Sequence, residues 1–264
     1  MRVAQIGNGF VGNALHKSFK EKGIDTIIYD KFQKIGKIED TLDADIIFLC
    51  LPTPYVEGFG FGLGAIQENL KFLAKLNFKG ICVIKSTVEP GTTRCLEGQY
   101  DLRICHNPEF LSEKTAFEDF HNQEHIVIGI NEELERDMEV VRLYQDLYLN
   151  AKISICKSEE SEVMKLFCNN FYAMKVQIFN EFYFLCQKIG ADFYEIRDLM
   201  LENDWINPMH TQVPGRDGKM SYGGHCFPKD TKALCHFMKI LGSPHGILQA
   251  CITERDSMRD KKLE

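Results

Sequence analysis

The chain has 264 residues, 44% of them hydrophobic, and a formal net charge of −7 at pH 7. This length allows one large domain or two ordinary ones, and the absence of a long basic run argues against nucleic-acid binding. No window approaches eighteen uninterrupted apolar residues, and the sequence enters a strand-like run directly. We therefore expect a soluble, cytoplasmic protein with no targeting peptide and no contact with a membrane.

The ten cysteines are better explained as free thiols than as a disulfide set. Most lie in apolar strand-like or helix-like runs, where buried free thiols are the default, and no CxxC pair occurs. The histidines are not at zinc-ligand spacing with them, so we expect no metal site. Only Cys95 and Cys226 lie near turn-forming residues.

Up to about residue 157, short apolar runs alternate with helical patterns. Helices are expected over residues 13–22, 65–76 and 132–147, and the strand-like runs are RVAQIG, TIIYD, DIIFLCLP, CVIKST, LRICHNP, HIVIGI and KISICK. Apolar runs of this length between helical patterns predict parallel strands covered on both faces. We therefore predict an α/β fold that begins with a doubly wound, Rossmann-type sheet over residues 1–157.

After residue 157 the strand pattern stops. Residues 158–189 predict one long helix that starts with acidic residues in its first turn and is closed by Gly190. Further helices are expected over 191–203, 231–241 and 247 to about 261, interrupted by a glycine-rich segment at 214–224. The pattern predicts an all-α domain over residues 158–264.

The first strand-like run is followed by GNGFVG, which opens the first helix. Gly7 permits a tight turn, Gly9 lets backbone N–H groups approach a pyrophosphate, and Gly12 allows close packing of helix against strand. Asp30, at the end of the second strand, would accept hydrogen bonds from ribose hydroxyls and repel a 2′-phosphate. A glycine turn alone can be a packing feature, but this context predicts NAD binding, with NAD preferred to NADP although lysines follow Asp30.

Five further runs appear in a fixed order after this fingerprint. They are LPTP (51–54), KSTVEPGTT (85–93), NPEFLSEKTA (107–116), SEVMKLFCNNFYAMKVQIFNE (161–181) and YGGHCFPKD (222–230). Together they resemble the UDP-glucose/GDP-mannose dehydrogenase family, whose members oxidise a sugar-nucleotide alcohol to the acid in two NAD-linked steps. The family normally continues into a third, nucleotide-binding domain, which we expect this chain to lack.

The resemblance implies a covalent role for Cys226. Oxidising a primary alcohol to an acid requires holding the aldehyde between two hydride transfers, and a thiolate does this as a thiohemiacetal that is oxidised to a thioester. Gly223 and Gly224 would leave room for substrate, and Lys229 would favour the thiolate although Asp230 weakens that effect. Composition alone would make Cys226 one more packed thiol.

Lys165 and Asn169 are four residues apart, so they share one face of the predicted long helix. Spacing alone favours a solvated surface lysine. The resemblance implies instead that the pair meets the reacting oxygen, where Lys165 would stabilise alkoxide charge.

The resemblance assigns roles to three carboxylates and one hydroxyl. Glu109 is the implied base for thioester hydrolysis, and Glu113 would lie near the nicotinamide and the reacting carbon. Thr87 would hold a water molecule or a sugar oxygen, and Asp230 would join the proton network around Lys165 and Thr87.

The same resemblance implies two sets of binding residues. For the cofactor these are Gly7, Gly9, Phe10, Val11, Gly12, Asp30, Pro52, Thr53, Ser86, Thr87, Glu113 and Lys229. For the substrate they are Phe110, Leu111, Lys165, Asn169, Tyr222 and Gly223, and the position of Arg216 and Lys219 before the cysteine loop adds these two as candidates. From the sequence alone, Arg216 and Lys219 are equally compatible with contacts to a diphosphate or carboxylate and with solvated loop charges.

Three interpretations follow. The first is an NAD-dependent dehydrogenase that oxidises C6 of UDP-glucose to give UDP-glucuronate and forms a homodimer through its long helix. The second is a 3-hydroxyacid-type dehydrogenase with a catalytic lysine, which has no need for Cys226. The third is an NAD-binding regulatory subunit without turnover. The polar residues retained in the matching runs favour the first.

Overall fold

The computed structural model describes residues 1–131 and 134–260, and these form two compact units. The sheet unit comprises residues 1–54 and 61–165, and the helical unit comprises residues 55–60 and the chain from 166 onward. The units therefore divide after Lys165, within a helix, whereas the sequence placed a domain boundary at residue 157.

Seven strands of the described residues form the sheet of the first unit, in the order β2-β1-β3-β6-β7-β8-β9. Their bounds are β1 (Val3–Ile6), β2 (Thr26–Tyr29), β3 (Ile46–Leu49), β6 (Ile81–Ile84), β7 (Arg103–His106), β8 (His125–Ile130) and β9 (Lys152–Lys157). From β2 to β7 all neighbours pair in parallel. Their last residues are in register, since Ile6 is paired with Leu49, Leu49 with Ile84 and Ile84 with His106. The segments that follow these strands therefore emerge at one edge of the sheet.

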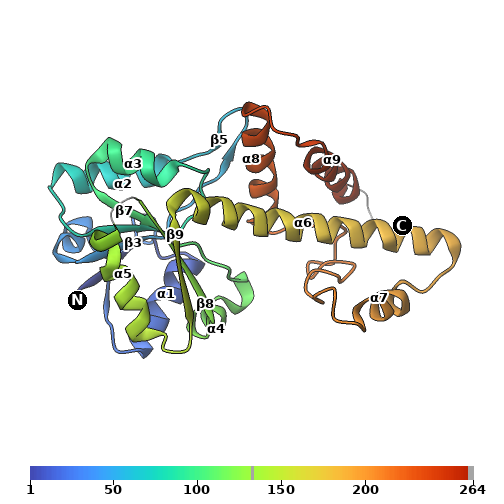
Figure 1. The fold of residues 1–264 in the computed structure, drawn as a ribbon, viewed down its shortest axis with the longest axis horizontal. Helices are drawn as coiled ribbons and strands as arrows, with labels where there is room; N and C mark the ends of the chain where they lie inside the picture. Colours follow the sequence, from blue (N-terminus) through green and yellow to red (C-terminus); the bar gives the residue numbers. More distant parts are fainter. Residues whose placement is uncertain (132–133, 261–264) are drawn as a thin grey trace. The chain divides into compact units, whose positions relative to one another are not determined.

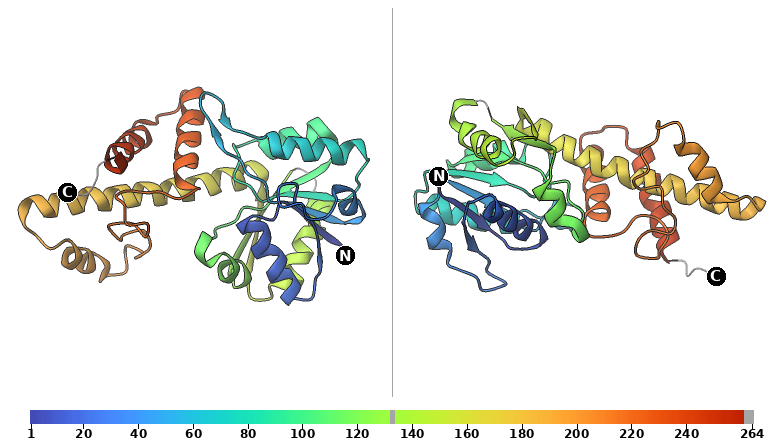
Figure 2. Two further views of the ribbon diagram at one scale, coloured as in Figure 1. Left: turned by 180° about the vertical axis from the view of Figure 1, so that it is seen from behind. Right: turned by 90° about the horizontal axis from the view of Figure 1, so that it is seen from below.

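Helices cover both faces of this sheet (Figures 1 and 2). They are α1 (Phe10–Glu21), α2 (Gly64–Lys75), α3 (Thr92–Tyr100), α4 (Ala116–His121) and α5 (Leu134–Leu147). Helices α2 and α3 pack on one face, and α1, α4 and α5 on the other. The predicted α/β, Rossmann-type fold is confirmed. Two short 3-10 helices, η1 (Ile38–Asp43) and η2 (Glu113–Thr115), also belong to the sheet unit. A small pair of strands, β4 (Tyr55–Val56) and β5 (Gly60–Phe61), is formed by a segment of which residues 55–60 belong to the helical unit.

The direction of two strands and the number of helices differ from the prediction. Strand β8 pairs antiparallel to β7 through His106 and Gly129, so β8 and β9 run opposite to the other strands. The connection between β7 and β8 contains only the short helices η2 and α4 and no long crossover helix. Helices α3 and α4 were not predicted because both are short, and the first two positions of the expected helix over 132–147 lie outside the described residues.

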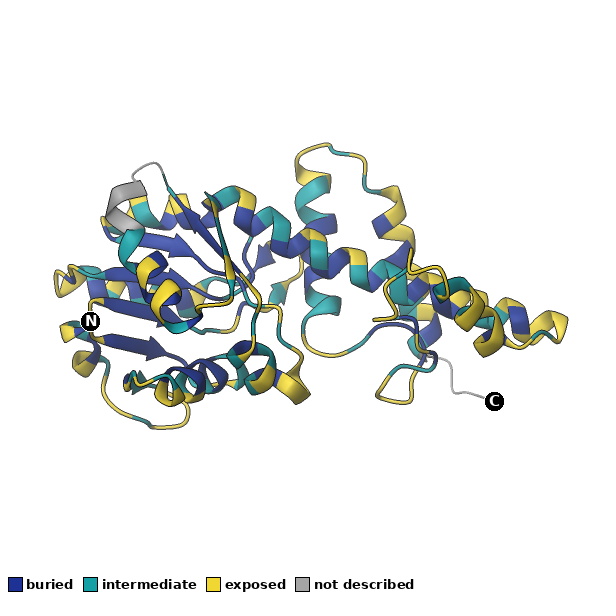
Figure 3. Ribbon diagram, turned by 60° about the horizontal axis from the view of Figure 1, so that its bottom comes forward, coloured by how far each residue is buried: buried dark blue, intermediate teal, exposed yellow. Residues whose placement is uncertain are grey.

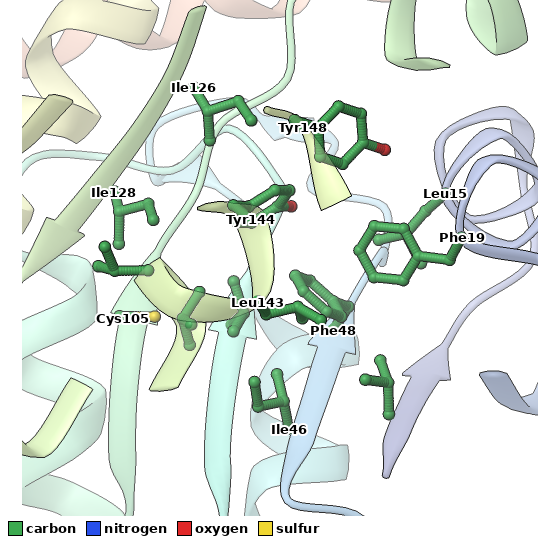
Figure 4. Packing of buried hydrophobic residues seen from close by; sticks show 14 of the residues in the cluster. Leu15, Phe19, Ile46, Phe48, Cys105, Ile126, Ile128, Leu143, Tyr144 and Tyr148 are labelled. Carbon is green, nitrogen blue, oxygen red and sulfur yellow. The ribbon is translucent and has the colours of Figure 1, made fainter. Parts of the chain in front are cut away.

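An aromatic cluster forms the centre of the core between the sheet and helices α1, α4 and α5 (Figure 4). Phe19 is fully buried, and its ring contacts Phe48 at a centroid distance of 5.6 Å and Tyr144 at 6.1 Å. Phe120 and Tyr148 pack on the same rings. Figure 3 shows the strands of this sheet largely in the colour of buried residues.

The long helix α6 (Ser158–Ile189) begins in the sheet unit, where three contacts fix its first turn. Gly129 of β8 leaves no room for a side chain, because an added Cβ would lie 2.5 Å from the Ser161 Cβ atom. The Ser161 hydroxyl lies 2.8 Å from Nδ1 of the fully buried His106. The Glu162 carboxylate accepts hydrogen bonds from the N–H groups of Gly91 and Thr93, at the start of α3.

The helical unit contains the rest of α6, then α7 (Phe193–Leu201), α8 (Phe227–Ile240) and α9 (Gly246–Asp260). Helix α6 ends at Gly190, which adopts a left-handed conformation with φ of 72°, as the sequence predicted. The predicted helices over 191–203, 231–241 and 247–261 are confirmed within a few residues, except that position 261 lies outside the described part of the chain. Helix α8 starts four residues earlier than predicted because Pro228 is acceptable in a first helical turn.

All ten cysteines lie in the described residues as free thiols, as predicted, and Cys95 is exposed. Across residues 1–131 and 134–260, no helix combines the length and apolar character needed to cross a membrane.

Replacing Phe19 by Ala should lower the free energy of unfolding by about 3–5 kcal/mol, because it opens a cavity among four aromatic rings. Chemical denaturation measures this change. The matched control is Phe32→Ala, whose ring is 88% exposed and whose loss should change stability by less than about 0.5 kcal/mol. Equal effects of the two substitutions would contradict the packing described here.

A second prediction concerns His106. Burial lowers its pKa to about 3, so between that value and the ordinary 6.5 the unfolded chain binds a proton that the folded chain does not. The free energy of unfolding must therefore decrease as the pH is lowered below 6.5, by up to about 1.4 kcal/mol per pH unit for this group. In His106→Gln, the amide can hydrogen-bond to the Ser161 hydroxyl and the Ser86 carbonyl oxygen in place of the imidazole. Denaturation curves of this variant should show a smaller decrease in the free energy of unfolding on acidification. An unchanged pH dependence would rule out a buried neutral histidine.

Candidate active site

The glycine turn after β1 has the shape that a dinucleotide site requires. Gly7 has a φ of +95°, and an added Cβ would lie 2.3 Å from the Cys50 carbonyl oxygen. At Gly12 a Cβ would lie 2.2 Å from the Gly7 carbonyl oxygen, so only glycine allows α1 to start this close to the strand. Gly9 has nothing within 4 Å of an added Cβ, and it precedes α1 without any side-chain cap. The turn thus presents an open backbone surface and an uncapped helix N-terminus, which fit a pyrophosphate.

Asp30 ties the glycine turn to the segment after β2. Its Oδ2 accepts a hydrogen bond of 2.7 Å from the Asn8 N–H, and its Oδ1 accepts from the N–H groups of Phe32 and Gln33. A carboxylate has about four lone-pair positions, so Oδ2 keeps the capacity to accept one more bond. Asp30 therefore fits the expected ribose contact and also holds the turn in place, a role that the sequence did not indicate.

The segments after β3 and β6 lie against each other at the same edge. The Thr53 hydroxyl donates to the Thr87 carbonyl oxygen at 2.7 Å, and the Ser86 hydroxyl donates to the Leu51 carbonyl oxygen at 2.5 Å. Thr53 and Thr87 are buried and Pro52 is exposed. Thr87 lies in the segment between β6 and α3, since α3 begins only at Thr92.

A buried network fixes the segment after β7. Lys85 Nζ, 2% exposed as a residue, donates to Asn107 Oδ1 at 2.7 Å, and the Tyr144 hydroxyl donates to the same oxygen at 2.5 Å. The Asn107 amide in turn donates to the Val127 carbonyl oxygen. Burial lowers the pKa of Lys85 to about 8, although the nearby Cys50 and Glu109 oppose the shift. The ordered Asn107 holds the backbone that leads directly into Pro108 and Glu109.

Lys165 and Glu109 meet within the sheet unit. The lysine Nζ donates to the Glu109 carbonyl oxygen and lies 3.6 Å from its Oε1, while Glu109 Oε2 accepts from the Leu111 N–H at 2.7 Å. The Lys165 ammonium also lies 4.8 Å from the centre of the Phe110 ring. The two side chains are only 4% and 9% exposed, so Lys165 is not a solvated surface residue. By contrast Glu113, four residues from Glu109, is exposed at the start of η2.

In the helical unit, Asp230 is the centre of a second polar group. Fully buried in the first turn of α8, it accepts hydrogen bonds from Asn169 Nδ2 at 2.6 Å and from Lys229 Nζ at 2.5 Å. Asn170 donates to its carbonyl oxygen at 3.3 Å. Asn169 lies one turn after Lys165 on α6, as the spacing predicted.

Cys226 is the N-cap residue of α8, and its carbonyl oxygen accepts from the Asp230 N–H at 3.0 Å. It is partly buried. The partial positive charge of a helix N-terminus stabilises negative charge on a sulfur placed there.

The other predicted substrate residues of this unit differ in exposure. Tyr222 is buried, Gly223 is half-buried, and Arg216 and Lys219 are exposed in the glycine-rich segment. That segment turns back on itself through a hydrogen bond of 2.9 Å between the Gly215 N–H and the Lys219 carbonyl oxygen.

Sequence reasoning missed three residues that support these groups. Lys85 and Asn107 stand inside matching runs but were not singled out, although a lysine ending the apolar run CVIK is a signal of a buried charge. Glu162 was likewise passed over, and its hydrogen bonds hold α6 to α3. Burial raises the pKa of Glu162, against the effect of the donors from Thr93 and Gly91.

Comparison with known proteins identifies the family. Residues 31–148 match the family model for the NAD binding domain of the UDP-glucose/GDP-mannose dehydrogenase family, and residues 159–255 match that for its central domain. A UDP-glucose 6-dehydrogenase of Rhizobium meliloti is 30% identical, over 98% of this chain and 68% of its own length. A GDP-mannose 6-dehydrogenase of Pseudomonas aeruginosa is 26% identical, over 92% of this chain and 59% of its own length.

Solved structures confirm the fold. A UDP-glucose dehydrogenase from Pyrobaculum islandicum superposes with a TM-score of 0.85 at 23% identity, over 97% of this chain and 68% of that one. The chain thus spans between about three fifths and two thirds of these relatives. The expected resemblance and the expected cofactor, NAD, are confirmed by the matches. The chain belongs to the UDP-glucose/GDP-mannose dehydrogenase family.

Proposed function

We propose that this chain oxidises the primary alcohol of a sugar nucleotide to the carboxylate, and that the substrate is UDP-glucose, oxidised at C6 to UDP-glucuronate. One observation carries the proposal: Cys226 heads helix α8, and one turn later Asp230 is bound to Asn169 and Lys229. The relatives named UDP-glucose 6-dehydrogenase support the choice of sugar.

In this proposal, each of two domains has a separate role. Residues 1–157 hold the cofactor, and residues 158–264 form a helical domain that contributes the lysine and the cysteine. The separate family matches to 31–148 and 159–255 support this division.

The cofactor is held by the edge of the sheet where the parallel strands end. Backbone N–H groups from Gly9 to Gly12 would bind the pyrophosphate of NAD, and Asp30 would accept hydrogen bonds from the adenosine ribose. The remaining contacts come from Pro52, Thr53, Ser86, Thr87, Glu113 and Lys229. Bound NAD supplies a hydride acceptor for each oxidation.

The first oxidation removes a proton, which is released to water, and a hydride, which the bound cofactor would accept, from the substrate alcohol. Lys165 and Asn169 hold the alcohol oxygen and stabilise the negative charge that develops on it. Glu109 keeps the Lys165 ammonium in place through both its carbonyl and its carboxylate oxygens. Asp230 accepts a hydrogen bond from Asn169 Nδ2, and this bond fixes the orientation of the amide group.

The second oxidation proceeds through sulfur. The Cys226 thiolate forms a C–S bond to the aldehyde carbon, and the aldehyde oxygen gains a proton to give a thiohemiacetal. Loss of a proton and a hydride from this species gives a thioester. Glu109 then takes a proton from a water molecule that adds to the thioester carbon, the C–S bond breaks, and the acid and the thiolate are released.

Assays with purified protein should yield two molecules of NADH for each UDP-glucose consumed, because both oxidations occur before the acid is released. Cys226→Ser should lower acid formation by at least about 1,000-fold, since an alcohol is a far weaker nucleophile and leaving group here. Mass spectrometry of the wild-type reaction, quenched early, should detect the sugar nucleotide attached to the peptide that contains Cys226.

Cys95→Ser, at the exposed cysteine of α3, is the matched control and should leave the rate unchanged. One NADH per substrate, obtained only with a small hydroxyacid, would point to the hydroxyacid-type dehydrogenase. Turnover of neither class would point to the regulatory subunit.

We also propose that the chain forms a homodimer through helix α6. Six large apolar side chains are exposed on one face of this helix, at spacings of three, four and seven residues: Phe167, Phe171, Ile178, Phe182, Leu185 and Ile189. They are between 41% and 67% exposed. An apolar stripe of this length is typical of the contact between two copies across a two-fold axis.

Introducing charge into the stripe with Phe171→Glu and Phe182→Glu together should weaken the dimer by on the order of 100-fold or more, because each carboxylate loses its hydration in the contact. Sedimentation equilibrium measures the change. Gln187→Glu adds one such negative charge on the far side of the helix and should have no effect. A monomeric wild-type protein would contradict the proposal.

A further inference from the structure

The loop that leads to Cys226 is anchored to α6 by one residue. Ser221 has a φ of 56°, in the left-handed region that is unfavourable for serine. Its N–H donates to Asn180 Oδ1 at 2.8 Å, and its hydroxyl donates to Gln177 Oε1. Since Ser221 is 2% exposed, these bonds replace water and hold the strained backbone in place.

Two arginines of α9 hold the next carbonyl group from the other side. Arg255 Nε and Arg259 Nε both donate to the Tyr222 carbonyl oxygen, at 3.2 Å and 3.1 Å. Arg259 Nη2 also donates to the Ser221 carbonyl oxygen at 3.2 Å. The two arginines are four residues apart on α9, so both reach the same peptide from one helical face.

Packing around this peptide is tight. A Cβ added to Gly223 would lie 2.0 Å from Arg259 Nη2, so the guanidinium occupies the space that any other residue would need. The Arg255 guanidinium lies 5.6 Å from the centre of the Tyr222 ring. Arg259 Nη1 donates to Asp217 Oδ2 at 2.6 Å, which gives its charge a counter-ion within the same unit.

These contacts also define what the arginines do. All three nitrogens of Arg259 donate to the protein, and its side chain is only 13% exposed. Such a group acts on the backbone it binds and is poorly placed to take up a substrate phosphate. Only three residues separate Tyr222, whose carbonyl group the two arginines bind, from Cys226. One of these three, Gly224, has a φ of +76°. The hydrogen bonds from Arg255 and Arg259 to the Ser221 and Tyr222 carbonyl oxygens form a clamp, and this clamp fixes the start of the glycine-containing stretch.

We propose that Arg255 and Arg259 are positioning residues for Cys226: by fixing the Ser221 and Tyr222 carbonyl groups, α9 sets the place of the sulfur at the start of α8. The consequence for catalysis rests on the proposed function of Cys226. The geometric claim, that α9 orders this loop, does not require any turnover.

The test measures thiol accessibility directly. Wild type and the variants Arg255→Gln, Arg259→Gln and the double variant are treated with iodoacetamide, and alkylation of each cysteine is followed by peptide mass spectrometry. Alkylation of Cys226 should accelerate by at least about threefold relative to the exposed Cys95 in the double variant, because the released loop samples open states. The buried Cys82 and Cys105 should stay unreactive, which reports that the sheet unit remains folded.

Kinetics provide the second measurement. With UDP-glucose and NAD, the double variant should lose about 10- to 100-fold in kcat with KM for NAD unchanged, because a sulfur displaced by about 1 Å reacts poorly. Arg259→Lys should not restore the rate, since one ammonium cannot reproduce the planar fork that joins two carbonyls and Asp217. Arg142→Gln, which removes the same charge from an exposed site on α5, is the matched control.

The proposal would be overturned if the double variant showed the alkylation rate of Cys226 and the kcat of the wild type. It would also be overturned if alkylation accelerated equally at Cys82 and Cys105 and Arg259→Lys behaved as the wild type. A change in Cys226 alkylation together with undiminished acid production by Cys226→Ser would instead overturn the covalent role of the cysteine and leave the clamp intact. The two failures are therefore distinguishable.

Discussion

The register of the parallel strands is the constraint on which the cofactor site depends. Hydrogen bonds align Ile6, Leu49, Ile84 and His106 at one edge of the sheet, so the segments that follow them must emerge side by side. A slip of one residue in any pair would move every buried side chain of that strand to the opposite face. The buried runs on both faces of the sheet therefore fix the register and, through it, the positions of the glycine turn and the polar loops.

Several charged side chains are buried in this structure. Lys85, Lys165 and Asp230 are all nearly or fully inaccessible, and each contacts an oxygen or an amide that offsets its loss of hydration. Removing one partner from such a group leaves the other uncompensated, which costs more than the pair itself contributes. These groups lie after β6, on α6 and in the first turn of α8, where their partners hold each charge in a fixed position.

Sequence reasoning predicted well wherever a local rule applied. The apolar runs gave the strands, the glycine spacing gave the dinucleotide turn, and Gly190 marked the end of α6 to the residue. It failed at α3 and α4, whose short, weakly periodic sequences carry little signal, and at the reversal of β8, because strand direction is decided by pairing between segments that are distant in the chain. The partners of Lys85 and Glu162 were not predictable either, because they lie 22 and about 70 residues away.

The sequence by itself therefore determined the fold class, the family and the identity of the chemical groups, because these follow from periodicity, spacing and ordered motifs. Only the tertiary structure decided which groups touch. It buried Lys165 against Glu109 but left Glu113 exposed, and it engaged Asp30 with three backbone N–H groups. It also brought Arg259 of α9 onto the loop before Cys226. Such contacts join residues distant along the chain, and no local pattern encodes them because they arise only when separate elements pack.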